Sequence, residues 1–150
     1  MSDLLYSKDV LRLAAEARGA GRLDHPDGSF SEHNPTCADR TTVDLQVEDG
    51  RISAMAHDTK ACVLAQASAS ILGATLHGCT LADLKTLRGQ IAGMLKGEAP
   101  PAEPFEQYGI LIEVAQFASR HRCVLLPVDA AIRAFEVSQA SKPGGQGSKD

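Results

Sequence analysis

The fold is decided by residues 41–58, TTVDLQVEDGRISAMAHD, in which two runs of alternating polar and apolar residues flank a turn signal. The alternation over residues 39–48 predicts a half-buried strand. Its core-facing side chains are expected to be Thr41, Val43, Leu45 and Val47. Asp49-Gly50 predicts a two-residue hairpin turn, so residues 51–58 form the return strand. The core-facing side chains of that strand are expected to be Ile52, Ala54 and Ala56.

On both sides of this hairpin, the apolar residues recur with helical spacing. The pattern predicts helices over about residues 7–18, 62–77, 80–96 and 124–137, a partly helical segment over 105–118, and a short strand near 29–32. Thr80 and Asp83 match a capping box, and Ser7 is suited to cap the first helix. The expected fold class is α+β: a small three-stranded antiparallel sheet with helices packed on one face.

The composition is that of one folded domain. The chain has 150 residues, of which 43% are hydrophobic, enough to bury a core, and only 4% are aromatic. The core is therefore expected to consist of Ala, Leu, Val and Ile. Residues 1–137 are expected to form the domain, and residues 138–150, rich in Gly, Ser and Lys, a disordered tail.

Charge and hydropathy narrow the possible partners. The net charge is −4, which argues against a nucleic-acid partner held through phosphate contacts. No apolar run approaches the roughly 20 residues that span a bilayer, so no membrane partner is expected. The start, Met1-Ser2-Asp3, lacks the basic and then apolar pattern of a signal peptide. We therefore expect a cytoplasmic protein, whose cysteines are ligands, nucleophiles or buried thiols rather than disulfides.

Three of the four cysteines lie where one kind of element gives way to another. Cys37 is in the loop NPTCAD (34–39), with Asp39 two residues further on. Cys62 and Cys123 are each at the start of a predicted helix, where free backbone N–H groups and the helix dipole favour a thiolate. Three thiolates and a carboxylate can close a tetrahedral metal site. If one position opens, they can instead take up sulfur or hold an iron–sulfur cluster.

Less specific interpretations of these cysteines stay open. The chain has no C-x-x-C pair, and any single cysteine is equally well explained as a small buried hydrophobic residue. Cys79, in a turn between two predicted helices, is expected to be structural. His33 and His121 are close in sequence to Cys37 and Cys123, so a cysteine hydrolase is conceivable. No glycine-rich oxyanion turn accompanies either pair, which makes the hydrolase the weakest alternative.

Two arginines, Arg120 and Arg122, flank the third cysteine of this set, Cys123. Their positive charge could lower the pKa of the thiol or pair with Asp39. The plainer interpretation is a basic surface beside the start of a helix.

The chain resembles the scaffold proteins of iron–sulfur cluster assembly, the IscU/NifU N-terminal family, over roughly residues 3–136. The loop NPTCAD (34–39) is similar to the family's N-P-x-C-G-D, although Ala38 replaces its glycine. Ala61-Cys62 followed by ASAS (67–70) is similar to the second-cysteine segment, again with alanine in place of glycine. RHRC (120–123) is similar to the third-cysteine segment.

Two features are similar to the SufU branch of this family. The stretch between Cys62 and Cys123 is long, with extra helical material around residues 88–108. Arg122 stands where IscU-type scaffolds have a histidine, and Arg120 matches an arginine of SufU-type sequences. The L-P-P-V-K motif of IscU is absent before the third cysteine.

The resemblance implies a role in iron–sulfur cluster biogenesis. The protein would accept sulfur from a pyridoxal-phosphate cysteine desulfurase of the SufS or IscS kind and assemble it into, or relay it for, a [2Fe–2S] cluster. The implied metal ligands are Cys37, Asp39, Cys62 and Cys123, and the three cysteines would hold the cluster. Cys37, on the loop, is the expected persulfide acceptor. Zinc is expected in the protein as isolated, and the cluster transiently.

Downstream partners implied by the resemblance are apo iron–sulfur proteins or a second scaffold. Within the family, the alternative is a zinc-dependent sulfurtransferase that activates its desulfurase without building a cluster. From another class, the alternative is a zinc-stabilised protein-interaction domain. A scaffold or sulfur-acceptor role is favoured over a stand-alone enzyme.

Overall fold

The computed structural model describes residues 6–35 and 38–141. In chain order, the elements are α2 (Lys8–Glu16), β1 (Gly28–His33), β2 (Arg40–Glu48), β3 (Arg51–Lys60), α3 (Val63–Thr75), α4 (Leu81–Met94), the 3₁₀ helices η1 (Glu106–Gln116) and η2 (Ala118–Arg120), and α5 (His121–Ser141). The segment predicted to be partly helical is therefore 3₁₀-helical.

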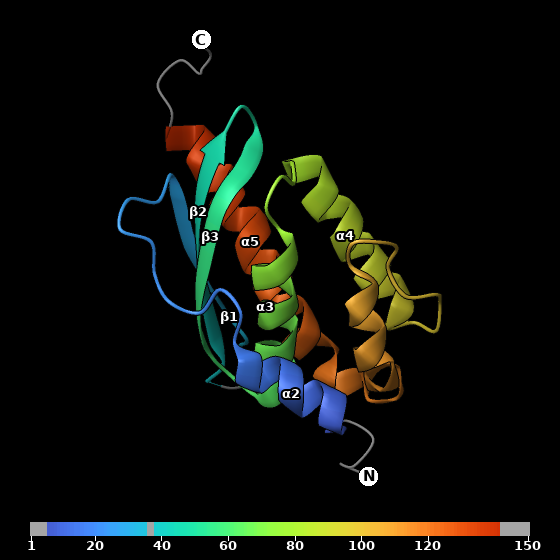
Figure 1. The fold of residues 1–150 in the computed structure, drawn as a ribbon. Coiled ribbons are helices and arrows are strands. Elements are labelled where there is room, and N and C mark those ends of the chain that lie inside the picture. The colour runs from blue at the N-terminus through green and yellow to red at the C-terminus, as the bar shows by residue number, and fades with distance from the viewer. Residues whose placement is uncertain (1–5, 36–37, 142–150) are drawn as a thin grey trace.

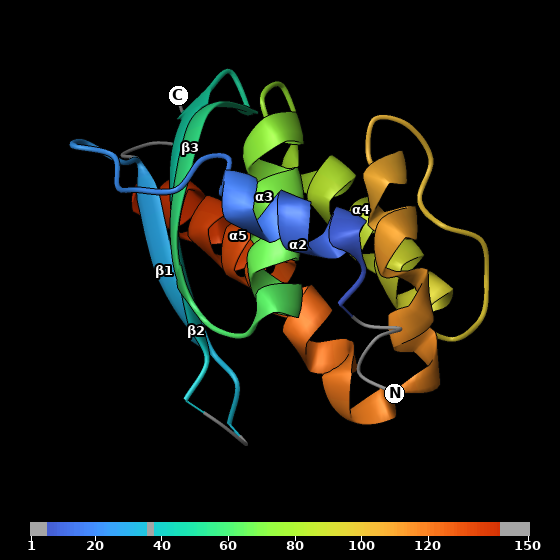
Figure 2. The same cartoon turned by 60° about the horizontal axis from the view of Figure 1, so that its bottom comes forward.

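The three strands form one antiparallel sheet in the order β1-β2-β3. Helices α5 and α3 lie against one face of it, and α4 lies farther from the sheet (Figure 1). Helix α2 packs on α3 (Figure 2). The predicted fold class, α+β with a three-stranded antiparallel sheet and helices on one face, is confirmed.

The hairpin has the predicted turn. Asp49 and Gly50 both have positive φ, 54° and 75°, as a type I′ turn requires. Glycine adopts this conformation without a steric penalty, and Asp is among the few other residues that tolerate it.

A β-bulge changes which side chains of β3 face the helices. The register shifts beside Gln46, so Ala54 pairs with Gln46 and Ala56 pairs with Asp44 on the outer face of the sheet. The prediction that Ala54 and Ala56 share the helix-facing side of the sheet with Ile52 is therefore wrong, although Ala56 is buried on the outer face, with 6% exposed. Ile52, before the bulge, faces the core as predicted and is 1% exposed. A period of two cannot reveal the extra residue, because a bulge reverses the alternation.

The loop between α2 and β1 covers the free edge of β3 and part of the outer face. His57 donates a backbone hydrogen bond to Gly19 at 2.9 Å and accepts one from Gly21 at 2.8 Å. Arg22 then reaches the carboxylate of Asp44 on β2, with Nε 2.7 Å from Oδ2. This loop therefore protects one edge of the sheet from pairing with another chain.

The predicted helix starts are confirmed by their caps. Ser7 Oγ accepts a hydrogen bond from the Val10 N–H at 3.2 Å. Thr80 and Asp83 form the complete capping box, with bonds of 3.0 and 3.1 Å. Each bond satisfies a backbone N–H that has no partner inside its helix.

Helix α5 differs from its prediction at both ends. It begins at His121 instead of residue 124, so Cys123 is inside its first turn. It continues to Ser141, past the expected end at residue 137, so the tail expected from residue 138 begins with helical residues. Residues 142–150 lie outside the described part of the chain.

The core between sheet and helices is mainly aliphatic, as predicted, and Leu45, Leu64 and Ile71 are 0% exposed. Gly73 lets the end of α2 approach α3 closely, because a Cβ at this position would overlap the carbonyl of Arg18. Within the described residues, no helix is both long enough and apolar enough to cross a membrane.

Candidate metal centre

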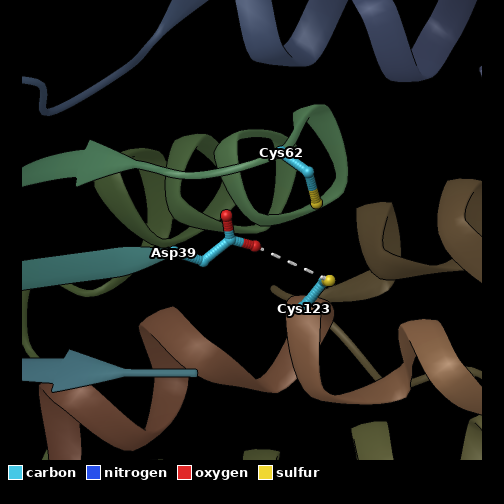
Figure 3. A group of neighbouring side chains, drawn as sticks. All are labelled: Asp39, Cys62 and Cys123. Atoms are coloured by element: carbon cyan, nitrogen blue, oxygen red, sulfur yellow. Dashed lines mark hydrogen bonds between the residues drawn. The ribbon is translucent and has the colours of Figure 1, made fainter. Parts of the chain in front are cut away.

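Asp39, Cys62 and Cys123 come together at one end of the sheet (Figure 3). Asp39 directly precedes β2, Cys62 is the N-cap residue of α3, and Cys123 is in the first turn of α5. A hydrogen bond from the Asn34 N–H to the Asp39 carbonyl, 3.0 Å, closes the base of the loop between β1 and β2. Three segments far apart in sequence thus supply one side chain each.

The ligand atoms of these three residues all lie within 4.8 Å of one another. The Cys123 Sγ is 4.0 Å from Oδ2 of Asp39. Cys123 is 3% exposed, whereas Asp39 and Cys62 are half-buried, so the group is partly accessible to solvent. Cys37, the fourth predicted ligand, lies outside the described residues, and its role stays a prediction.

The surroundings of Cys62 favour its thiolate. A hydrogen bond with Cys123 lowers the pKa of Cys62 most, burial raises it, and the backbone N–H groups of Ala65 and Leu64 lower it again, to about 6 overall. These N–H groups belong to the first turn of α3, where they have no partner inside the helix. These contacts therefore favour the thiolate of Cys62, as its place at a helix start predicts.

The pKa of Cys123 moves in the opposite direction. It is raised first by the hydrogen bond with Cys62, then by burial and by the negative charges of Cys62 and Asp39. Arg120 opposes this rise, since its positive charge favours the Cys123 thiolate. Cys123 therefore keeps its proton more readily than Cys62, and a bound cation would favour its loss.

The donor set suits a thiophilic metal ion. Zinc binds thiolate sulfur and carboxylate oxygen in a tetrahedron, and at Zn–S bonds of about 2.3 Å its ligand atoms lie about 3.8 Å apart. The observed separations, up to 4.8 Å, require only small side-chain adjustments to reach that geometry. The three described residues leave one position of a tetrahedron to be filled.

The fourth cysteine and the two histidines close in sequence to Cys37 and Cys123 are not part of the candidate metal group. Cys79 is 8% exposed, its pKa is raised by burial, and its thiol faces the Thr75 carbonyl, which fits the predicted structural role. His121 Nε2 is 3.2 Å from the Ala115 carbonyl, and His33 is exposed. Among the described residues, the candidate metal group contains no histidine. This arrangement counts against a Cys–His hydrolase built on Cys123.

The two arginines beside Cys123 have different environments. The charges of Cys123 and Cys62 raise the pKa of Arg120, after a larger effect of Tyr6, so Arg120 lies on the side of the centre. Arg122 is exposed. The predicted influence of an arginine on the Cys123 thiol therefore comes from Arg120.

The sequence profile of the NifU-like N terminal domain matches residues 5–122 of the chain. The chain belongs to this family. The match covers Asp39 and Cys62 and ends one residue before Cys123. Family membership is thus confirmed, together with the resemblance on which the site was predicted.

Named relatives of this NifU-like domain are scaffold proteins. The iron–sulfur cluster assembly scaffold protein IscU of Thermotoga maritima is 25% identical over 123 residues, 82% of this chain and 87% of that protein. The iron–sulfur cluster assembly scaffold protein IscU 1 of Archaeoglobus fulgidus is 31% identical over 94 residues, 62% of this chain and 61% of that protein.

Solved structures share the fold. The N-terminal NifU-like protein of Brucella abortus has a TM-score of 0.88 at 30% identity, covering 93% of this chain and 98% of that one. A protein of Fervidobacterium islandicum described as a scaffold of the SUF system has a TM-score of 0.79 at 18% identity, covering 90% of this chain and 99% of that one. At that identity the likeness shows the fold alone, and the SufU-type branch stays a prediction.

Proposed function

We propose that this NifU-like N-terminal domain is an iron–sulfur cluster assembly scaffold that accepts sulfur from a pyridoxal-phosphate cysteine desulfurase and assembles or relays it for [2Fe–2S] clusters. The observation that carries the proposal is the convergence of Asp39, Cys62 and Cys123 within 4.8 Å from three separate elements. The names of the IscU relatives support the same role. The iron and sulfide of the cluster are cargo, which the protein holds and passes on to apo iron–sulfur proteins or a second scaffold.

Zinc is the proposed ion in the isolated protein, with Cys37, Asp39, Cys62 and Cys123 as its ligands. When bound, zinc keeps thiolates deprotonated and shields them from oxidation. Asp39 is the hardest and most readily exchanged ligand of the set, so it is the natural one to yield when cargo arrives. The surroundings of Cys62 support this assignment, since the N–H groups at the start of α3 and the neighbouring Cys123 thiol lower its pKa and so favour the thiolate that zinc binds.

Cys37 is the proposed sulfur acceptor, because it belongs to the loop between two strands, whereas Cys62 and Cys123 are held by helices. The Cys37 thiolate would attack the outer sulfur of the partner's cysteine persulfide. A new S–S bond forms on Cys37, the S–S bond of the partner breaks, and the partner's cysteine leaves as a thiolate. No oxidant is consumed in this exchange.

The test measures alanine release by the desulfurase of the same organism with and without the protein. We expect faster release with wild type, a sulfur adduct on Cys37 by mass spectrometry, and neither with Cys37→Ser. Cys79→Ser is the matched control, because Cys79 lies outside the metal group, and it should behave as wild type. If neither stimulation nor adduct is found, the sulfur-acceptor role is wrong.

Anaerobic reconstitution with iron and sulfide separates the scaffold from its alternatives. A scaffold develops the charge-transfer absorption of a [2Fe–2S] cluster. A zinc-dependent sulfurtransferase stimulates the desulfurase but forms no cluster, and a zinc-stabilised interaction domain does neither. Asp39→Ala should lengthen the lifetime of a reconstituted cluster in air, because the readily exchanged carboxylate is expected to promote release of the cargo. A shorter lifetime would contradict the role given to Asp39.

A further inference from the structure

A chain of buried hydrogen bonds joins α3, η1 and α5 beside the metal centre. The Ser68 hydroxyl donates to the Val124 carbonyl at 2.7 Å. The Tyr108 hydroxyl lies 2.8 Å from Ser68 Oγ and 3.2 Å from the Ser68 carbonyl, and Ser68 and Tyr108 are both 0% exposed. Because the Ser68 proton is directed at Val124, the Tyr108 proton is directed at Ser68, and the bonds run one way along the chain.

This chain of bonds connects the two helices that carry the sulfur atoms. Ser68 is on α3, the helix capped by Cys62, and lies about 9 Å from it along the axis at about 1.5 Å per residue. Val124 directly follows Cys123 on α5. A helix is stiff over this distance, so the bond between Ser68 and Val124 restrains the separation of Cys62 and Cys123.

The first turn of α5 needs such a restraint. Pro127 is inside the helix and has no backbone N–H, so it cannot supply the hydrogen bond that the carbonyl of Cys123 would receive from the fourth following residue. The turn that carries Cys123 therefore lacks one of its usual bonds. The Ser68 hydroxyl adds a bond from outside the helix at the adjacent carbonyl, that of Val124.

We propose that Ser68 and Tyr108 are positioning residues of the metal centre, which hold the sulfurs of Cys62 and Cys123 at the spacing that one metal ion requires. This inference rests on the proposed function. It assigns a role to η1, the segment between α4 and α5 that supplies Tyr108. Buried hydroxyl groups stabilise a structure only if each of them has a hydrogen-bond partner, as both do here. Residues that position the metal ligands without touching the ion also tune metal affinity.

The test compares Ser68→Ala and Tyr108→Phe with Ser70→Ala. Ser70 is also 0% exposed on α3, but its Oγ accepts from the backbone N–H of Arg18 at 3.1 Å, toward α2. We expect Ser68→Ala to release zinc to a chelator about tenfold faster than wild type, the lower end of the usual effect of such partners. Tyr108→Phe should act in the same direction, and the double variant should be less than additive. The cobalt-substituted spectrum should shift in both.

Ser70→Ala should lower the melting temperature while leaving zinc release and the cobalt spectrum at their wild-type values. The proposal is overturned if Ser68→Ala and Tyr108→Phe release zinc as wild type does, or if Ser70→Ala changes release and spectrum equally. Equal changes in Ser70→Ala would mean that zinc release follows a general loss of stability instead of the position of the sulfurs.

A metal-free measurement separates failure of this inference from failure of the proposed function. In a Cys37→Ser/Cys79→Ser background only Cys62 and Cys123 remain, and both thiols can bind one phenylarsine oxide. We expect Ser68→Ala to lose the arsenical to a competing dithiol about tenfold faster. If wild type holds neither zinc nor cobalt, the proposed zinc site is wrong, while this measurement still shows whether the Ser68 hydroxyl sets the spacing of Cys62 and Cys123. Equal release with and without the Ser68 hydroxyl overturns it.

Discussion

Two carboxylates of the central strand region have opposite surroundings. Asp44, on β2, is 0% exposed and accepts hydrogen bonds from Arg22 Nε at 2.7 Å, Arg22 Nη2 at 3.1 Å, Ser29 Oγ at 2.6 Å and the Leu23 N–H at 3.0 Å. Asp39, just before β2, faces the sulfur of Cys123 at 4.0 Å. One carboxylate is surrounded by donors, and the other lies among groups that become anions.

The pKa of Asp44 and the pKa of Cys123, the thiol that faces Asp39, move in opposite directions. Burial alone would raise the pKa of Asp44, but hydrogen bonds from Arg22, Ser29 and Leu23 and the charge of Arg22 outweigh it, so the pKa is lowered. At the other site, the neighbours of Cys123 raise its pKa. A buried carboxylate such as Asp44, whose charge is balanced by donors of the same chain, is structural. A thiol such as Cys123, which keeps its proton until a cation arrives, is suited to bind metal.

The largest expected effect concerns the candidate metal centre, where Asp39 faces Cys123. Cys123→Ser should reduce zinc from about one ion per chain to a small fraction, and should lower thermal stability, because metal binding contributes to folding. Elemental analysis and calorimetry measure both. Cys79→Ser should retain its zinc. Equal zinc content in Cys123→Ser and wild type would remove Cys123 from the ligand set.

A smaller effect is expected at Asp44, the carboxylate with a structural role. Asp44→Asn removes the charge that pairs with Arg22 and should lower the free energy of unfolding by about 2 kcal/mol. Its zinc content should not change. Asp39→Asn should show the reverse, with less zinc and little loss of stability in the metal-free protein. Urea denaturation and zinc analysis of both variants test the contrast, which is wrong if both variants lose zinc equally.

The smallest expected effect is the pH dependence of stability that comes from His57, a third buried polar residue. Its Nε2 lies 2.8 Å from the Arg18 carbonyl and its Nδ1 2.9 Å from Thr59 Oγ1, and burial lowers its pKa despite opposing effects of Arg18 and Asp58. The folded state thus binds fewer protons than the unfolded state. The free energy of unfolding should therefore fall as pH drops below about 6.5, by at most about 1.4 kcal/mol per pH unit.

Denaturation between pH 5 and pH 8 measures this dependence. The difference between wild type and His57→Gln isolates the contribution of His57, since other titrating groups are common to both proteins. A pH dependence that is unchanged in His57→Gln would show that His57 does not titrate on unfolding in this range.

Local signals in the sequence were sufficient for most of the fold. The Asp49-Gly50 turn and the Thr80 capping box depend on neighbouring residues alone, so both were predictable. The bulge that reverses Ala54 and Ala56 was not, because it depends on pairing between two strands. Nor was the burial of Asp44, since its partner Arg22 comes from a loop with no regular pattern.

The candidate site was predictable in its residues but not in its chemistry. Helix starts placed Cys62 and Cys123, and the family motif joined them to Asp39. The opposite directions in which the pKa values of Cys62 and Cys123 move depend on distances and burial that no local pattern contains. The roles of Ser68 and Tyr108 were hidden for the same reason, because they are separated by 40 residues and meet only in the folded chain.

The most direct test of the metal centre is zinc K-edge X-ray absorption on the protein as purified. The account predicts three sulfur neighbours at about 2.3 Å and one oxygen at about 2.0 Å. In Cys37→Ser, one sulfur should be lost, and in Cys79→Ser the spectrum should be unchanged. A histidine scattering pattern, a shell of four sulfurs, or no bound zinc would contradict a centre formed by Cys37, Asp39, Cys62 and Cys123.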